Sequence, residues 1–337
     1  MKVTKITALF LALLLLCSCA PGAEEHSATI FAMDTVMGIT VYGPQGKEAA
    51  DAASGRIREL EKLFSVTDPN SDIYAANHSG GAPVEVSDDT AVLLSRALEL
   101  CSSTGGALDV TIYPVVKAWG FTTGEYRVPE DGTLSVLLEQ VDYSRITLEG
   151  HTLTVPDGME LDLGAVAKGW TGDQVAALLA DAGVTSAKLE LGGNIHLVGA
   201  KPDGSPWRIA VRDPSGESYA GIVEVTDKAV VTSGGYERYF EADGITYWHI
   251  MDPADGRPAR SGLVSATVVS DSGVQADALS TALFVLGAEG AADYWREHRD
   301  FDFILLGEDG TVTVTEGIAG SFTLCGDWEG HQAEIVK

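Results

Sequence analysis

The sequence predicts a single α+β domain in which mixed and antiparallel sheets are layered with helices. Two observations lead to this prediction. Segments with strand-like alternation and segments with helical spacing follow one another without strict alternation, which is typical of α+β layers rather than a doubly wound sheet. Beyond residue 29 we find no internal repeat, low-complexity run or linker, so we expect residues 30–337 to form one domain.

The segment 161–179, LDLGAVAKGWTGDQVAALL, is the expected centre of the molecule. The alternating residues 159–163 predict a strand that ends at Gly164. Apolar residues at helical spacing from Ala165 onward predict a helix that stops near Gly183. A strand that turns through a glycine into a helix leaves unpaired backbone N–H groups, and the helix dipole makes such a turn attractive to anions.

Two charged residues flank this turn: Asp162 precedes it, and Lys168 lies one turn into the helix. The pair can hold a phosphate-bearing ligand, or the two side chains can simply pair with each other. On this spacing alone the structural interpretation is the commoner one, because polar residues are frequent at strand–helix junctions.

Periodicity and turn signals place the remaining elements. Strands are expected at 30–42, 187–198, 207–211, 221–226, 229–232, 237–241, 246–250 and 263–270, with hairpins at 145–163 and 301–315. Helices are expected at 47–64, 90–101, 134–141, 274–286 and 288–299, and irregular segments at 65–86 and 105–121.

The N-terminus has the form of a bacterial lipoprotein signal. Lys2 and Lys5 precede the apolar run 8–16, which is too short to span a bilayer, so residues 1–18 are expected to be a signal peptide. The run closes with Leu-Cys-Ser-Cys, which resembles a lipobox cleaved before Cys19. We therefore expect a lipid on Cys19, a tether at 19–29 and a location on the extracytoplasmic side of the cell membrane. The alternative is an ordinary signal peptide with a chance cysteine.

The charge balance limits the partners. The chain has 22 basic and 49 acidic residues, a formal charge of −27. So acidic a surface argues against nucleic acid and against electrostatic attachment to anionic lipid, which leaves the N-terminal lipid as the expected membrane contact. A negatively charged ligand would need a local cation, a metal or a helix end. Beyond Cys19 only Cys101 and Cys325 remain, too few for a disulfide framework.

Several common catalytic signatures are missing. There is no G-x-G-x-x-G, no H-x-x-x-H or C-x-x-C pair and no G-x-S-x-G. Residues 164–169 have the glycine spacing of a P-loop, but Trp170 stands where that motif requires lysine. The sequence therefore does not indicate a zinc site, a P-loop or a serine hydrolase.

Two candidate groups remain near the C-terminus. Asp277 and Thr281 lie four residues apart on one face of an expected helix, and their oxygen atoms suit Mg²⁺. Such a pair is usually a solvated face or a cap, yet this helix is apolar on most sides, so a buried Asp would need a partner. His249 ends an expected strand before a glycine-containing turn. A lone histidine is more often structural, although this position suits proton transfer.

Seven segments, in this order, resemble the ApbE family, the FAD:protein FMN transferases. They are Met33-Asp34-Thr35 for M-G-T; 106–111 with Pro114 and 119–121 for G-x-x-D-x-T…P…W-G-F; 161–169 for D-L-S-x-I-A-K-G; 191–195 for L-G-G-N-I; 232–240; 249–253 with Gly256; and 276–282. Asp34 replaces the family's Gly, and Gly164 replaces a common Ser.

The resemblance implies the following site and reaction. FAD would contact Met33, Ala107, Leu108, Asp109, Asp162, Lys168, His249 and Ile250, and Mg²⁺ would be held by the carbonyl of Ala165 with Asp277 and Thr281. FMN would pass from FAD to a Thr or Ser of an extracytoplasmic flavoprotein with a D-x-x-x-G-A-[ST]-type site, releasing AMP. His249 and Asp109 are the candidate general bases, and we prefer His249. The alternatives are an Mg-dependent FAD pyrophosphatase that yields FMN and AMP, and a flavin-binding lipoprotein without turnover.

Overall fold

The computed structural model describes residues 24–216 and 218–337. The expected signal peptide, the expected lipidation site Cys19 and the first part of the expected tether lie outside the described residues. Within the described part of the chain, no helix is long and apolar enough to cross a membrane.

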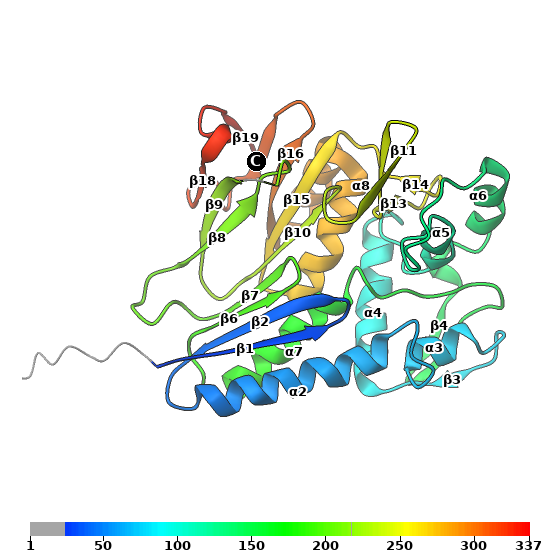
Figure 1. Ribbon diagram of the computed structural model, residues 1–337, viewed down its shortest axis with the longest axis horizontal. Helices are drawn as coiled ribbons and strands as arrows, with labels where there is room; N and C mark the ends of the chain where they lie inside the picture. Colours follow the sequence, from blue (N-terminus) through cyan, green and yellow to red (C-terminus); the bar gives the residue numbers. More distant parts are fainter. Residues whose placement is uncertain (1–23, 217) are drawn as a thin grey trace, which may run out of the picture.

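One nine-stranded sheet runs through the molecule (Figure 1). All its neighbouring strands pair antiparallel except the last two, which are parallel. In spatial order the strands are β1 (Glu25–Ala32), β2 (Thr35–Tyr42), β6 (Ala187–Leu191), β7 (Asn194–Val198), β10 (Ala229–Gly234), β15 (Leu263–Ser270), β16 (Phe301–Gly307), β17 (Val312–Thr315) and β19 (Ala333–Val336).

Helices cover one face of this sheet, and a second small sheet covers part of the other. The helices are α2 (Gly46–Phe64), α7 (Ala167–Asp181) and α8 (Gly273–His298). The small sheet has the order β18 (Phe322–Leu324), β9 (Tyr219–Val225) and β8 (Trp207–Arg212), and its apolar side chains share a core with β15 and β16. The α+β prediction, with antiparallel sheets layered against helices, is therefore confirmed.

The remaining elements lie beside one end of the large sheet (Figure 1). The helical ones are α3 (Asp72–Asn77), α4 (Asp88–Ser103), α5 (Tyr113–Ala118), α6 (Asp131–Leu138) and η2 (Tyr143–Arg145). The strands are β3 (Val84–Glu85), β4 (Thr147–Glu149), β5 (Thr152–Thr154), β11 (Tyr239–Ala242), β12 (Ile245–Trp248), β13 (Met251–Asp252) and β14 (Arg257–Pro258). A short helix, η3 (Gly326–Trp328), follows β18 near the C-terminus.

The expected strand at 30–42 is instead a hairpin. β1 and β2 pair antiparallel, and Met33 and Asp34 form the turn between them with φ values of 48° and 58°. Two positive φ values in succession are typical of the tight turns that join twisted strands. Because β1 begins at Glu25, residues 25–29 of the expected tether belong to the sheet. The expected strand at 187–198 divides in the same way at Gly192 and Gly193.

The expected strand at 159–163 is also wrong. These residues form an extended loop, because their backbone groups bond to a side chain and to another loop rather than to a ladder. Asn77 accepts from the Leu161 N–H at 2.7 Å and donates to the Leu161 carbonyl at 2.9 Å, while the Asp162 N–H donates to the Val110 carbonyl at 2.8 Å. The following helix, α7, begins at Ala167 rather than at Ala165.

Other boundaries differ less. The segments 65–86 and 105–121 contain the short elements α3, β3 and α5, and β18 and β19 were not predicted. Two helices were expected at 274–299. The chain forms them as α8 with a break at Gly287, whose φ of 74° and ψ of 178° are not helical. Ser87 caps α4, because its hydroxyl accepts from the Thr90 N–H.

Candidate active site

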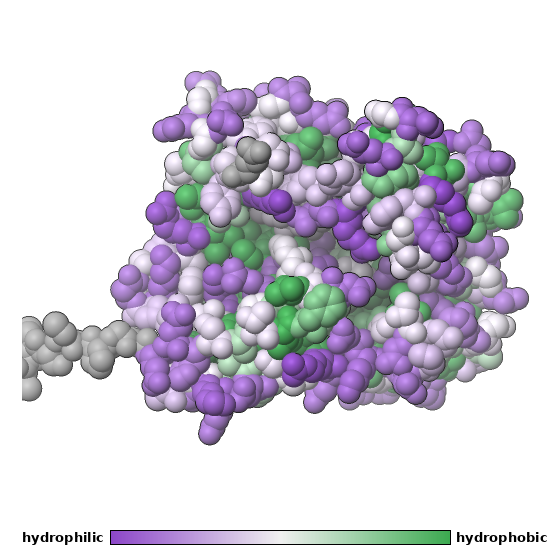
Figure 2. Space-filling model, viewed as in Figure 1, coloured by the Kyte–Doolittle hydropathy of each residue, from purple (hydrophilic) through white to green (hydrophobic). Residues whose placement is uncertain are grey.

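A cavity of about 720 Å³ lies where the β1–β2 turn, the loop before α7, and the helix α8 meet. Figure 2 shows the surface hollowed on this face, beside the β1–β2 hairpin. Every residue that the sequence assigned to FAD, to magnesium or to catalysis lines this one cavity: Met33, Ala107, Leu108, Asp109, Asp162, Ala165, Lys168, His249, Ile250, Asp277 and Thr281. The structure thus brings together residues from distant segments, and their individual roles stay predictions.

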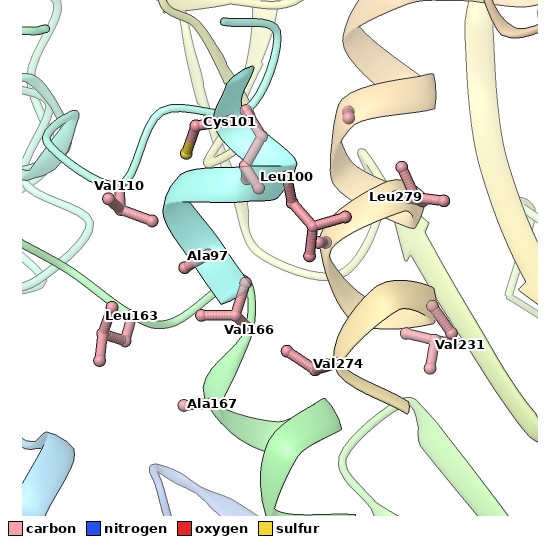
Figure 3. Close-up of a cluster of buried hydrophobic side chains, with 14 of the residues drawn as sticks. Ala97, Leu100, Cys101, Val110, Leu163, Val166, Ala167, Val231, Val274 and Leu279 are labelled. Carbon is pink, nitrogen blue, oxygen red and sulfur yellow. The ribbon is translucent and has the colours of Figure 1, made fainter. Parts of the chain in front are cut away.

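Buried apolar side chains hold the turn before α7 in place. Val166 is fully buried and Leu163 nearly so, in one cluster with residues of α4 and α8. Figure 3 shows Val166 at the start of α7, between Ala97 of α4 and Val274 of α8. Because Leu163 and Val166 are packed in this hydrophobic cluster, the polar residues Asp162 and Lys168 of the same segment face the cavity.

Asp162 and Lys168 do not pair with each other. Asp162 accepts the Gly164 N–H at 2.9 Å, whereas Lys168 Nζ donates to the Gly164 carbonyl at 3.2 Å and lies 3.9 Å from Asp277 Oδ1. Burial raises the pKa of Asp162, against the opposing effects of the Gly164 N–H and of the Arg238 and Lys168 charges. The pairing alternative left open by the sequence is therefore not what the structure adopts.

Asp277 is 4 % exposed, which rules out a solvated helix face. Its Oδ2 accepts the backbone N–H of Gly169 on α7 at 2.8 Å, and its Oδ1 has the Lys168 ammonium at 3.9 Å. Within residues 24–216 and 218–337, no hydrogen-bond donor is recorded on Oδ1, which leaves this buried carboxylate oxygen available to a ligand.

The donors around Asp277 suit a hard divalent cation. Thr281 adds a hydroxyl, 3.4 Å from that of Ser233, and Ala165, whose backbone carbonyl is the third expected ligand, lines the same cavity. The described residues contain no group of three His, Cys, Asp or Glu that could hold a metal by themselves. One carboxylate with neutral oxygen donors fits Mg²⁺, which keeps several positions for water and substrate phosphates, and it does not fit zinc.

His249 presents an unprotonated nitrogen. Its Nδ1 lies 3.3 Å from the carbonyl oxygen of Arg238. A carbonyl only accepts, so in the neutral ring Nδ1 carries the hydrogen and Nε2 is left as a proton acceptor. Burial, together with the nearby charges of Arg238 and Lys168, lowers the pKa of His249 to about 4, against the opposing effect of the hydrogen bond to the Arg238 backbone. The ring is therefore neutral at neutral pH.

Asp109, the other candidate base, accepts hydrogen bonds that stabilise its own loop. Its Oδ1 accepts the N–H and the hydroxyl of Thr111 at 2.8 and 2.6 Å, and its Oδ2 accepts the N–H of Tyr143 at 3.1 Å. Burial raises the pKa of Asp109 in spite of these hydrogen bonds. Because both oxygens are occupied, the geometry favours His249 over Asp109 as the base.

Comparison with known proteins decides the family. The model of the ApbE family matches residues 33–305. The chain belongs to the ApbE family. It is 37 % identical over 289 residues to an FAD:protein FMN transferase of Vibrio cholerae, covering 82 % of this chain and 86 % of that protein. It is 33 % identical to one of Treponema pallidum, covering 90 % of each chain.

Solved ApbE structures agree with this assignment. The ApbE protein of Thermotoga maritima superposes with a TM-score of 0.82 at 30 % identity, covering 87 % of this chain and 98 % of that one. The flavin transferase ApbE from Vibrio cholerae gives a TM-score of 0.79 at 32 % identity, covering 87 % and 98 %.

Two cavity residues of this ApbE-family chain carried no role in the sequence prediction. Arg238 lines the cavity and donates to the Phe121 carbonyl at 2.6 Å, and Asn194 lines it from β7. Both lie inside segments that match the family, 232–240 and 191–195. The signal was therefore present as a motif, but nothing in the sequence shows that these two side chains reach the same cavity as Lys168.

Proposed function

We propose that this ApbE-family protein transfers FMN from FAD to a Ser or Thr hydroxyl of another, extracytoplasmic protein, forming a phosphoester and releasing AMP in an Mg-dependent reaction. One observation carries the proposal: a buried carboxylate with a free oxygen, a lysine and a neutral histidine converge on one cavity. The names of the similar proteins, FAD:protein FMN transferase, support the choice of substrate.

The proposed reaction is a displacement at phosphorus. The acceptor hydroxyl oxygen attacks the phosphorus atom that bears riboflavin, and the bond from that phosphorus to the bridging oxygen breaks. AMP leaves with the bridging oxygen, and the hydroxyl proton passes to Nε2 of His249. No oxidant or further reactant is required.

The positive groups of the cavity bind and orient the diphosphate. Lys168 places its ammonium between the turn and Asp277, and Arg238 approaches from the segment before β11. When bound by Asp277, Thr281 and the Ala165 carbonyl, Mg²⁺ would neutralise charge on the phosphates. The cavity lining also carries the carboxylates of Asp34, Asp109, Asp162, Glu237 and Asp277, so Lys168, Arg238 and a bound Mg²⁺ would be needed to offset the charge of the diphosphate.

The proposed location follows from the N-terminal sequence. A lipid on Cys19 would hold the protein at the membrane, on the extracytoplasmic side. The acceptor protein must then expose its target hydroxyl on that side as well.

One experiment separates the three possible activities. The full chain is incubated with FAD and Mg²⁺, with and without an acceptor that carries a D-x-x-x-G-A-[ST] site. Flavin fluorescence on the denatured acceptor band, with AMP in equal amount, supports the proposal. AMP and FMN formed at the same rate without acceptor indicate a pyrophosphatase, and intact FAD indicates a binding protein; either result overturns the proposal.

The protein's own band serves as an internal control. Each Gly-Ala pair of the chain is followed by Glu, Pro, Leu, Val, Lys or Ala and never by Ser or Thr. We therefore expect no flavin fluorescence at the protein's own mass after denaturation.

A further inference from the structure

Asn194 carries a buried amide nitrogen that no described residue satisfies. The residue is 2 % exposed, and its Nδ2 has no hydrogen-bond partner among the described residues. Most buried side-chain polar atoms in proteins are paired, so each exception needs a reason. Among the buried unpartnered side-chain atoms of residues 24–216 and 218–337, Nδ2 of Asn194 is the only one whose residue lines the cavity.

The strand ladder shows which way Asn194 points. Asn194 and His196 are two residues apart on β7, so their side chains lie on the same face of the sheet. The His196 ring fills the space beside Gly172 of α7 and Gly273 of α8, since a Cβ on either glycine would come within 2.1 or 1.9 Å of it. Asn194 therefore points to the face that α7 and α8 cover.

The same ladder places Asn194 level with Asp277. His196 and Gly273 are in contact and serve as a common starting point. Asn194 lies two residues along β7 from His196, a distance of about 7 Å, and Asp277 lies four residues along α8 from Gly273, a distance of about 6 Å. Farther along, the hydroxyls of Ser233 on β10 and Ser280 on α8 are 2.7 Å apart, so α8 continues to run alongside the strands. Asn194 thus lies at the level of the Asp277–Lys168 pair.

We propose that the Asn194 side-chain amide donates a hydrogen bond to an anionic oxygen of the diphosphate bound in this cavity. The inference rests on the proposed function for the identity of the ligand and adds a binding residue to it. The carboxamide can turn about its last torsion, which presents its N–H₂ group to the cavity. An anionic oxygen is the acceptor that this position favours. The Lys168 ammonium attracts negative charge to this part of the cavity, and a hydrogen bond to a charged group is stronger than one between neutral groups.

Two substitutions test the donor. Asn194→Leu keeps a similar volume but removes both polar atoms, and Asn194→Asp keeps the shape but replaces the donor with an acceptor. The dissociation constants for FAD, ADP and riboflavin are measured on the full chain with Mg²⁺ present, together with the melting temperature of the ligand-free protein. FAD and ADP contain a diphosphate, whereas riboflavin contains no phosphate.

We expect Asn194→Leu to weaken FAD and ADP binding about 10- to 100-fold and to leave riboflavin binding within twofold. Its melting temperature without ligand should be unchanged or higher, because an unpaired amide has been removed. Asn77→Leu is the matched control: both amide atoms of Asn77 bond to the Leu161 backbone, so this variant should melt at a lower temperature.

Unchanged FAD and ADP affinity in either folded Asn194 variant would overturn the inference, as would an equal loss of riboflavin affinity. If Asn194→Leu fails to fold, Asn194→Asp decides the question alone, since its volume is conserved. ADP binding needs no flavin transfer, so this arm tests Asn194 even if the wild-type protein proves to transfer no FMN.

Discussion

The backbone N–H of Gly169 on α7 donates a hydrogen bond to Oδ2 of Asp277 on α8, with an N–O distance of 2.8 Å. This bond requires the two helices to approach closely. A Cβ at position 169 would lie 2.2 Å from the Gly273 carbonyl oxygen and 2.7 Å from the Asp277 Cβ. The absence of a side chain at Gly169 therefore sets the position of the carboxylate that we expect to hold magnesium.

Gly169→Ala should push α7 away from α8 and displace Asp277. We expect a loss of about 1–3 kcal/mol of unfolding free energy, the usual effect of overpacking, together with a large loss of FMN transfer. Denaturant unfolding and the transfer assay measure the two effects. Gly55→Ala on α2 is the control, because its added Cβ would meet no described atom within 4 Å beyond its chain neighbours and the nearby helix backbone. Equal stability of the two variants would contradict the close-packing argument.

Asp277→Asn keeps the size of the side chain and an acceptor for the Gly169 N–H while removing the charge. Because Asp277 would be the only charged ligand, we expect transfer to fall at least about 100-fold and the Mg²⁺ concentration for half-maximal activity to rise. Asp293→Asn, at an exposed position on the same helix, should change neither quantity. Full activity of Asp277→Asn, or of the wild type in excess chelator, would show that the site is not a metal site.

The pH dependence of transfer tests His249 as the base. Its pKa is lowered to about 4, and the neutral form is the active one. The ratio kcat/KM should therefore be nearly constant from about pH 8 to pH 5 and fall as the pH drops through about 4, where Nε2 becomes protonated. Circular dichroism at each pH checks that the protein remains folded.

Two variants complete this test. His249→Gln should lower kcat about 10²- to 10⁴-fold and remove the acidic limb of the profile. Asp109→Asn should mainly lower stability, because its N–H₂ group would face either the donors of Thr111 or the N–H of Tyr143 and leave that hydrogen bond unmade. If the acidic limb persists in His249→Gln and disappears in Asp109→Asn, the roles of the two residues are reversed.

Cys19→Ala tests the proposed lipid anchor. We expect the wild-type protein to fractionate with membranes and the variant to appear in the soluble extracytoplasmic fraction, because no helix among residues 24–216 and 218–337 can hold it in a bilayer. Washing with high salt should not release the wild type, since the acidic surface provides no electrostatic attachment. A variant that stays with washed membranes would rule out lipidation at Cys19.

The sequence by itself determined the fold class, most helices and a set of predicted site residues that line one cavity. Spacing was enough to place α2 and α4, because each buries an apolar stripe, and α8 was placed by its long apolar run, which breaks at Gly287. The motif segments also identified the residues that line the cavity, since a motif records residue types that share a task even when they lie far apart in the chain.

Only the tertiary structure shows how those residues are arranged and bonded. The pattern shows a polar break at Asp34 and Thr35, but such a break does not by itself indicate a turn, so the hairpin that brings Met33 to the cavity could not be predicted from it. Likewise, the choice between His249 and Asp109, and the unpaired amide of Asn194, depend on which hydrogen bonds packing leaves unsatisfied. Those partners come from distant segments, and local periodicity carries no information about such pairings.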